Sequence, residues 1–237
     1  MSNPAQRLHT ILTRSKRKEL AANKMLVGWR NVLNQPDDID DLILMSKIGK
    51  VFTLPSIVTT HIARFPDLAP NRYLAWRSDL TAAFRAITFN VTFGQFSNRL
   101  SDSMLVNIDF CADALDRRMP EKDISQQELD GIRQSAWSLY EEILKSDLPP
   151  NVSRYLLDQL YLIIEAIDDY EITGAAGLER SLNAVIGSVI TETPTAKQAN
   201  HTPFADRFWD IMTKTGVALK VAKTAAELAE GVRKLLP

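Results

Sequence analysis

Apolar side chains recur every three or four positions along most of this chain, a pattern typical of amphipathic helices. Prolines and polar clusters interrupt the pattern and divide it into segments. The spacing predicts helices over residues 4–35, 37–55, 73–87, 103–117, 125–144, 151–170, 178–189 and 204–236. The sequence therefore predicts an all-α protein, a multi-helix bundle with a long C-terminal amphipathic helix.

Two short segments are open to a second interpretation. Ile57–Ile62 is rich in β-branched residues and follows Pro55, so it is either a strand or a helix that restarts at the proline. Ile87–Phe93 alternates apolar and polar residues, the best strand signal in the chain. No second run alternates as well, and an isolated strand leaves its backbone groups unpaired. We therefore favour a helix over Ile87–Phe93.

The polar segment Asp116–Asp123 contains Pro120 and marks a boundary. Residues 1–118 form an N-terminal helical region, and residues 124–190 form an antiparallel unit of three helices joined by short turns. Residues 191–203 hold two prolines and no apolar periodicity, so we interpret them as a linker. Residues 204–237 form the C-terminal helix.

The C-terminal helix has a narrow charged stripe, and its other faces are apolar or small. A helix this apolar needs cover on most sides, first from its own chain and second from a partner's groove. We take as the candidate partner-binding residues Val217, Val221, Leu228, Val232 and Leu235. A third use is to lie on a membrane surface, although acidic residues in the stripe disfavour anionic lipid.

Composition is that of an ordinary globular protein, with 45% hydrophobic and 24% charged residues. The net charge of −1 provides no global field that would attract nucleic acid. Residues 1–35 nevertheless carry seven Lys and Arg against one Glu, a local charge of +6. The candidate phosphate contacts in this basic run are Arg14, Lys16, Arg17 and Lys18, although a solvated helix face is the favoured interpretation.

A single cysteine, Cys111, excludes an internal disulfide and indicates a reducing cytoplasm. We expect this thiol to be buried and inert, as free cysteines usually are. The N-terminus has no apolar segment typical of a secretion signal. The longest uncharged runs are shorter than the ~20 residues of a spanning helix, so we expect no transmembrane segment.

No pattern of catalytic residues emerges. His9, His61 and His201 lie far apart, and none has a second ligand at a metal-binding spacing. Asp109, Asp113 and Asp116 fall on one helical stripe that could hold a divalent ion through oxygen ligands. Such stripes are usually solvated faces. We predict no catalytic residues, no metal site and no cofactor.

Residues 124–187 resemble a group of uncharacterised bacterial α-helical proteins, some encoded near mobile or defence-related genes. The features that carry the resemblance are the Ser125 capping box, Ser146–Leu148 before a turn, Asp169–Gly174, and the Gly177-Leu178 and Ile186-Gly187 pairs. The resemblance covers about a quarter of the chain and brings no catalytic residue with it. It implies a bacterial source and an accessory role in antiviral defence or toxin control.

The leading hypothesis is a cytoplasmic, non-enzymatic protein that binds another protein or a second copy of itself. Nucleic acid is an additional candidate ligand through the basic run of residues 14–18. One rival is a metal-dependent nuclease or other hydrolase that uses the Asp109, Asp113 and Asp116 stripe. Another rival is a membrane-associating effector that acts through the C-terminal helix.

Overall fold

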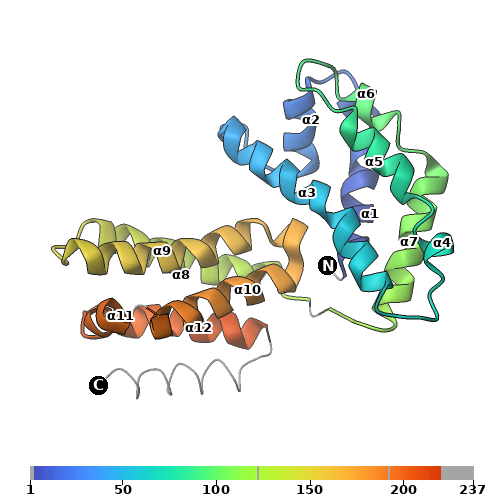
Figure 1. Ribbon diagram of the computed structural model, residues 1–237. Helices are drawn as coiled ribbons and strands as arrows, with labels where there is room; N and C mark the ends of the chain where they lie inside the picture. The colour runs from blue at the N-terminus through green and yellow to red at the C-terminus, as the bar shows by residue number, and fades with distance from the viewer. Residues whose placement is uncertain (1–2, 122, 192, 220–237) are drawn as a thin grey trace. The chain divides into compact units, whose positions relative to one another are not determined.

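A computed structural model describes residues 3–121, 123–191 and 193–219 (Figure 1). The described residues are mostly α-helical and contain no strand, which confirms the all-α prediction. The chain divides into two compact units, unit 1 (residues 1–121) and unit 2 (residues 122–237). The division falls inside the polar segment that contains Pro120.

Unit 1 is built around its first helix. Its elements are α1 (Pro4–Ser15), the 3-10 turn η1 (Lys18–Leu20), α2 (Met25–Val32), α3 (Asp41–Ile62), α4 (Pro70–Tyr73), α5 (Arg77–Arg85), α6 (Gly94–Ser97) and α7 (Asp102–Asp116). Helix α1 packs against α7, α3 and α2, and it buries Leu8, Ile11 and Leu12 completely. The Asn3 side chain caps α1 and donates a 2.9 Å hydrogen bond to the carbonyl oxygen of Ala112 in α7. The start of the chain is thus joined to α7, more than a hundred positions later.

Helix α3 runs through Pro55 and through Ile57–Ile62, the segment after the proline that the sequence left in doubt. The proline is buried inside the helix, and Ile57–Ile62 continue it as helix rather than as a strand. The Thr59 hydroxyl donates a 2.8 Å hydrogen bond to the Pro55 oxygen one helical turn back. The helix therefore does not stop and restart at Pro55, because α3 is a single helix of 22 residues.

The helix predicted over Ile87–Phe93 is wrong, and the strand alternative is wrong as well. These residues form a loop with one isolated bridge between Lys24 and Thr92. The Phe93 amide donates to the Asn23 oxygen at 2.9 Å, so the loop pairs its backbone with residues 21–25 and not along a helix. This loop conformation buries the Phe93 side chain completely and places its ring centroid 5.8 Å from that of Trp29.

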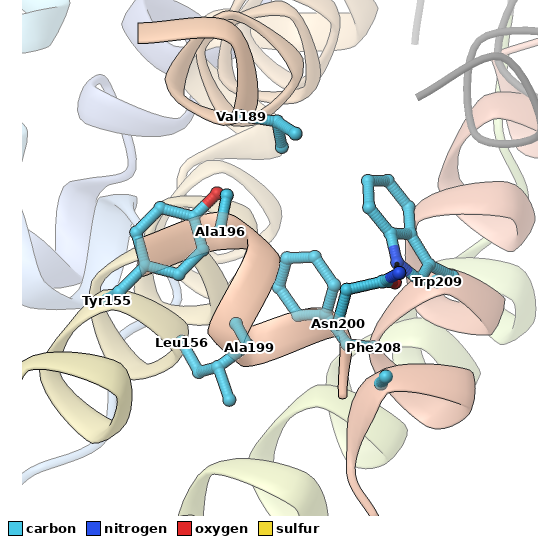
Figure 2. A pocket seen from close by; sticks show the side chains of 9 residues that line it. Tyr155, Leu156, Val189, Ala196, Ala199, Asn200, Phe208 and Trp209 are labelled. Atoms are coloured by element: carbon cyan, nitrogen blue, oxygen red, sulfur yellow. Dashed lines mark hydrogen bonds between the residues drawn. The ribbon is translucent and has the colours of Figure 1, made fainter. Parts of the chain in front are cut away.

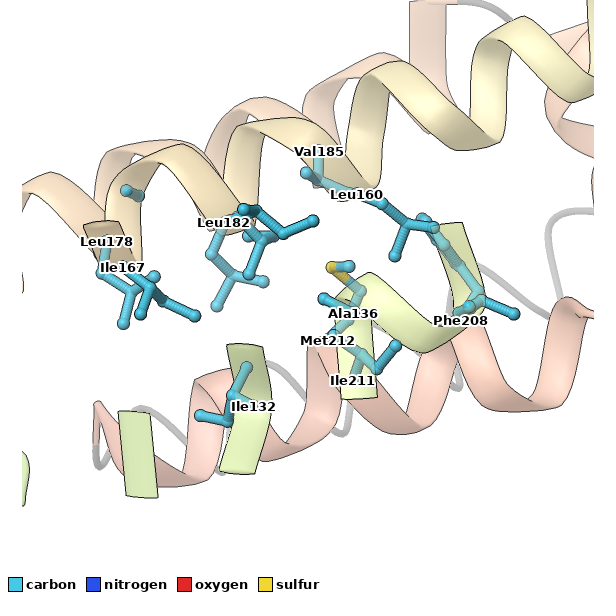
Figure 3. Packing of buried hydrophobic residues seen from close by; sticks show 14 of the residues in the cluster. Ile132, Ala136, Leu160, Ile167, Leu178, Leu182, Val185, Phe208, Ile211 and Met212 are labelled. Carbon is cyan, nitrogen blue, oxygen red and sulfur yellow. The ribbon is translucent and has the colours of Figure 1, made fainter. Parts of the chain in front are cut away.

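Unit 2 is a second helical bundle. Its helices are α8 (Gln126–Leu144), α9 (Pro150–Asp168), α10 (Tyr170–Thr191), α11 (Thr193–Asn200) and α12 (Ala205–Ala218). Helix α9 packs against α8, α10 and α11, while α12 packs against α8 and α10. Figure 3 shows how Leu160, Leu182 and Met212 from three of these helices meet in the core. The Ser125 capping box that the sequence predicts is present at the start of α8.

The linker predicted over residues 191–203 is largely a helix. Helix α11 lies within it and packs against α9, with Ala196 and Ala199 buried in the core of unit 2. Two small residues three positions apart are enough to form a contact face, but such a short pattern of small side chains does not appear as apolar periodicity in the sequence. The C-terminal helix is described only as α12, and residues 220–237 lie outside the described part.

One described helix, α3, is long and apolar enough to cross a membrane by length and composition alone. Its most apolar window has a mean hydropathy of 1.4, and 39% of that window is buried inside the structure. Leu44, Ile48 and Val51 form part of its buried stripe. The absence of a transmembrane segment stays a prediction.

Candidate functional site

A cavity of unit 1 lies beside the C-terminal half of α7. It has a volume of about 490 Å³, within the range typical of ligand-binding clefts. We call it the α4–α7 cleft, and it is lined by Arg72, Tyr73, Asn107, Phe110, Asp113, Ala114, Arg117 and Arg118. The lining combines two aromatic rings with three guanidinium groups, which is a composition suited to binding.

The short helix α4 is fixed to α7 by a sulfur contact. The Cys111 thiol donates a 2.8 Å hydrogen bond to the Tyr73 carbonyl oxygen, and the Trp76 indole N–H donates to the same oxygen at 2.8 Å. Cys111 and Trp76 are both buried, which confirms the prediction that this thiol is buried. Burial raises the pKa of the Cys111 thiol, so it stays protonated and serves as a donor. One wall of the cleft is therefore rigidly placed.

The three arginines of the cleft are in different states. Arg118 forms an ion pair with Asp67, donates a 3.1 Å hydrogen bond to the Ala114 oxygen and lies 5.8 Å over the Phe65 ring. The hydrogen bond from Arg118 lowers the pKa of the Asp67 carboxyl, which keeps this pair charged. Arg118 is thus already neutralised by its own chain.

Arg72 and Arg117 are the two available cations. Both side chains are exposed, and neither has a side-chain hydrogen bond or an ion pair within the described ranges. They come from different elements, α4 and the residue that ends α7. The cleft therefore presents two guanidinium groups whose charge is left for a ligand.

The outer face of α7 beside the cleft is apolar where a polar face is expected. Phe110 is 59% exposed and Val106 is 53% exposed, one helical turn apart. Asp113 and Arg117 continue the same line at steps of three and four residues. An exposed phenylalanine next to a cleft is a typical anchor point for a binding partner.

The predicted phosphate contacts at Arg14, Lys16, Arg17 and Lys18 do not line this cleft. Lys16 forms an ion pair with Asp102, and Arg14 also has a partner within its own chain. Arg17 and Lys18 are exposed around η1. The structure therefore leaves half of the basic run with its charge already partnered.

The acidic stripe of Asp109, Asp113 and Asp116 is exposed along α7. Asp109 lies 3.7 Å from the His9 imidazole, and Asp113 lines the cleft. In residues 3–121, 123–191 and 193–219, no three His, Cys, Asp or Glu side chains gather closely enough to hold a metal ion. The stripe is spread along the helix, as spacing in steps of three and four requires.

Unit 2 contains a much smaller cavity, about 10 Å³ in volume, between α9, α10, α11 and α12 (Figure 2). That volume is about the minimum for a single water molecule. The Trp209 indole N–H beside it donates a 3.1 Å hydrogen bond to the Asn200 side-chain oxygen. The cavity is a packing gap in the core and has no room for an organic ligand.

Of the predicted partner-binding residues, the structure describes one. Val217 is 54% exposed near the end of α12. Val221, Leu228, Val232 and Leu235 lie outside the described residues. The prediction of a docking face on the C-terminal helix therefore stays a prediction.

Comparisons with protein-family models, with curated proteins and with solved structures found no match to this chain. Of the eight residues that line the cleft, only Asp113 is a candidate from the sequence; Arg72, Tyr73, Phe110 and Arg117 are among the seven that are not. A usable signal was present in Val106 and Phe110, which interrupt the polar face of a helix at a four-residue step.

Proposed function

We propose that this chain is a non-enzymatic binding protein that holds a segment of another protein in the α4–α7 cleft. The observation that carries the proposal is the 59% exposed Phe110 at the edge of a cleft lined by two unpaired arginines. Aromatic residues and arginine are the types that contribute most to the free energy of protein–protein binding. A rigid wall fixed by Cys111 lowers the entropy cost of binding.

The size of the cleft supports a peptide segment rather than a whole folded surface. A volume of about 490 Å³ accommodates a few side chains. Val106 extends the apolar contact by one helical turn beyond Phe110. The occupant is therefore a short segment with at least one apolar side chain.

The biological setting is part of the same proposal. A single buried thiol suits a reducing cytoplasm. The resemblance of residues 124–187 to uncharacterised bacterial α-helical proteins, some encoded near mobile or defence-related genes, is the basis for proposing a role in a defence or toxin-control system. In such a system unit 1 recognises the partner.

The proposal is tested by selecting peptides from a displayed library of random dodecapeptides against the immobilised full chain. Selected peptides are then labelled, and their dissociation constants are measured by fluorescence anisotropy. Phe110→Ala should weaken binding by about tenfold or more, equivalent to 1.4 kcal/mol. The matched control is Phe89→Ala, because Phe89 is 42% exposed in the same unit and does not line the cleft.

Two results would contradict the proposal. One is a selection that enriches no peptide above the level of the bare support. The other is a set of peptides whose affinity is the same for the wild-type chain and for Phe110→Ala. Light scattering of the wild-type chain separates a third case, in which a second copy of the chain occupies the cleft and the protein is a dimer that Phe110→Ala dissociates.

A further inference from the structure

The charges of unit 1 restrict what its cleft binds. Residues 1–121 contain sixteen Lys and Arg and twelve Asp and Glu, a net charge of +4. The remaining residues contain twelve and seventeen, a net charge of −5. The almost neutral chain thus consists of a positive and a negative unit, and the α4–α7 cleft lies in the positive unit 1. A positive surface raises the association rate of negatively charged partners.

Within the cleft, the positive charge has a definite location. Arg118 is engaged by Asp67, while Arg72 and Arg117 have no partner in the part of the chain that the structure describes. A guanidinium group binds carboxylate and phosphate oxygens through two parallel hydrogen bonds. The two arginines come from α4 and from the residue that ends α7, and both line the same cavity, so an anion in the cleft has two guanidinium groups available to it.

The acidic residues of α7 distinguish between the two kinds of anionic macromolecule. Asp113 lines the cleft, and Asp109 and Asp116 are exposed on the same helix within one turn of it. A nucleic-acid strand carries a charge at every nucleotide, so a strand laid along α7 would bring phosphates against these carboxylates. A peptide can place one carboxylate at the arginines and neutral or basic side chains near Asp113.

We infer that the cleft recognises an acidic peptide segment, with an Asp or Glu carboxylate bound by Arg72 and Arg117 and a neighbouring apolar or aromatic side chain packed on Phe110. This inference rests on the proposed function and names the chemistry of its partner. The charge supplies orientation and association rate, and the contact with Phe110 supplies the slow dissociation.

The first test uses the peptides selected from the displayed library. The enriched sequences should contain Asp or Glu within a few positions of an aromatic or aliphatic residue. The double variant Arg72→Gln/Arg117→Gln should weaken their binding by about tenfold or more, and raising the salt concentration should weaken binding to the wild-type chain. The matched control Arg85→Gln/Arg99→Gln removes two exposed charges from unit 1 outside the cleft and should change affinity less than about threefold. Equal melting temperatures of the variants show that the fold is kept.

The failures of the inference and of the proposed function are distinguishable. Neutral or basic peptides that depend on Phe110 but bind equally well to Arg72→Gln/Arg117→Gln would overturn the inference and leave the proposed function standing. If Phe110→Ala and the double arginine variant both bind the peptides as well as the wild-type chain does, the inference and the proposed function are both overturned. A selection that enriches no peptide overturns both as well.

The second test addresses nucleic acid directly. A labelled dodecamer of oligothymidylate should bind the full chain at least about tenfold more weakly than the selected acidic peptides at the same salt concentration. Tighter binding of the oligothymidylate that is lost in Arg72→Gln/Arg117→Gln would overturn the peptide assignment and identify the cleft as a nucleic-acid site. Oligothymidylate binding that is lost only on Arg17→Gln/Lys18→Gln would instead reflect the basic run around η1, and the peptide assignment of the cleft would stand.

Discussion

The ring of Phe93 fills the space that a side chain on Gly28 would need. An ideal Cβ atom on Gly28 would lie 2.2 Å from the Cγ and Cδ2 atoms of Phe93, closer than carbon atoms approach. Phe93 cannot move aside, because its ring is fully buried against Trp29. Phe93 of the 87–93 loop can therefore pack in the core only because α2 has a glycine at position 28.

Gly28→Ala should consequently destabilise the protein, with a loss of about 3 kcal/mol in the free energy of unfolding from overpacking. Gly49→Ala is the matched control, because a Cβ on Gly49 in α3 meets nothing within 4 Å. That change should stabilise the helix by about 0.5–1 kcal/mol through the lower entropy of the unfolded chain. Urea denaturation followed by circular dichroism measures both changes, and equal midpoints for the two variants would contradict the interpretation.

The contact between Gly28 and Phe93 illustrates why some parts of the fold could be predicted from the sequence and others could not. Long helices such as α8 and α9 have a continuous apolar stripe, and periodicity alone predicts them. The single helix predicted over residues 4–35 is wrong, because α1 ends at Ser15 and α2 begins only at Met25. The conformation of the 87–93 loop depends instead on a glycine some sixty positions earlier, and no local pattern contains that information. The apolar and polar residues of the loop do alternate, but the apolar Phe93 is there because its ring packs against Trp29 and Phe96 and not because the segment is a strand.

The candidate site was less predictable for a related reason. Its cleft is lined both by Arg72 in a four-residue helix and by Arg117 at the end of another helix, and nothing in the sequence indicates that the two line one cavity. The basic run of residues 14–18 looked more promising because its charges are adjacent in sequence. Its Lys16 is neutralised by Asp102, a contact across 86 positions that periodicity does not reveal.

A second glycine with a measurable role is Gly174, which kinks α10. Its backbone has φ 64° and ψ −166°, a region open to glycine and strained for other residues. Gly174→Ala should cost about 1–3 kcal/mol in the free energy of unfolding. Gly187→Ala on the same helix is the control, since a Cβ there meets nothing within 4 Å, and it should not lower stability. A Gly174→Ala variant as stable as the wild type in urea would show that the kink carries no strain.

His61 makes the stability of unit 1 dependent on pH. Its pKa lies below the ordinary value of 6.5, chiefly because burial disfavours the imidazolium, and because Arg64 and Arg7 repel it more than Glu121 attracts it. The unfolded chain therefore takes up a proton near pH 6.5 while the folded chain does not. By linkage the free energy of unfolding falls as the pH is lowered from about 7.5 to 5.5.

His61→Gln should remove most of that fall. The measurement is the urea midpoint at the two pH values, with His201→Gln as a control for an exposed histidine of unit 2. The carboxyls of Asp67 and Glu142 have lowered pKa values, so their contributions are lost only as the pH falls below their ordinary values of 3.8 and 4.5. A wild-type pH dependence that persists unchanged in His61→Gln would contradict the assignment.

The Cys111 thiol reports on the integrity of the cleft wall. Because burial raises its pKa and its proton is donated to the Tyr73 oxygen, the reactive thiolate is scarce in the folded protein. At pH 8, modification by a disulfide reagent such as dithionitrobenzoate should be more than about tenfold slower in buffer than in 6 M urea. If the cleft binds a peptide against a rigid α4, saturation with a selected peptide should slow the native reaction further, because it opposes the opening that exposes Cys111. A native rate equal to the unfolded rate would mean that α4 does not shield the thiol, and the rigid wall assigned to the cleft would have to be abandoned.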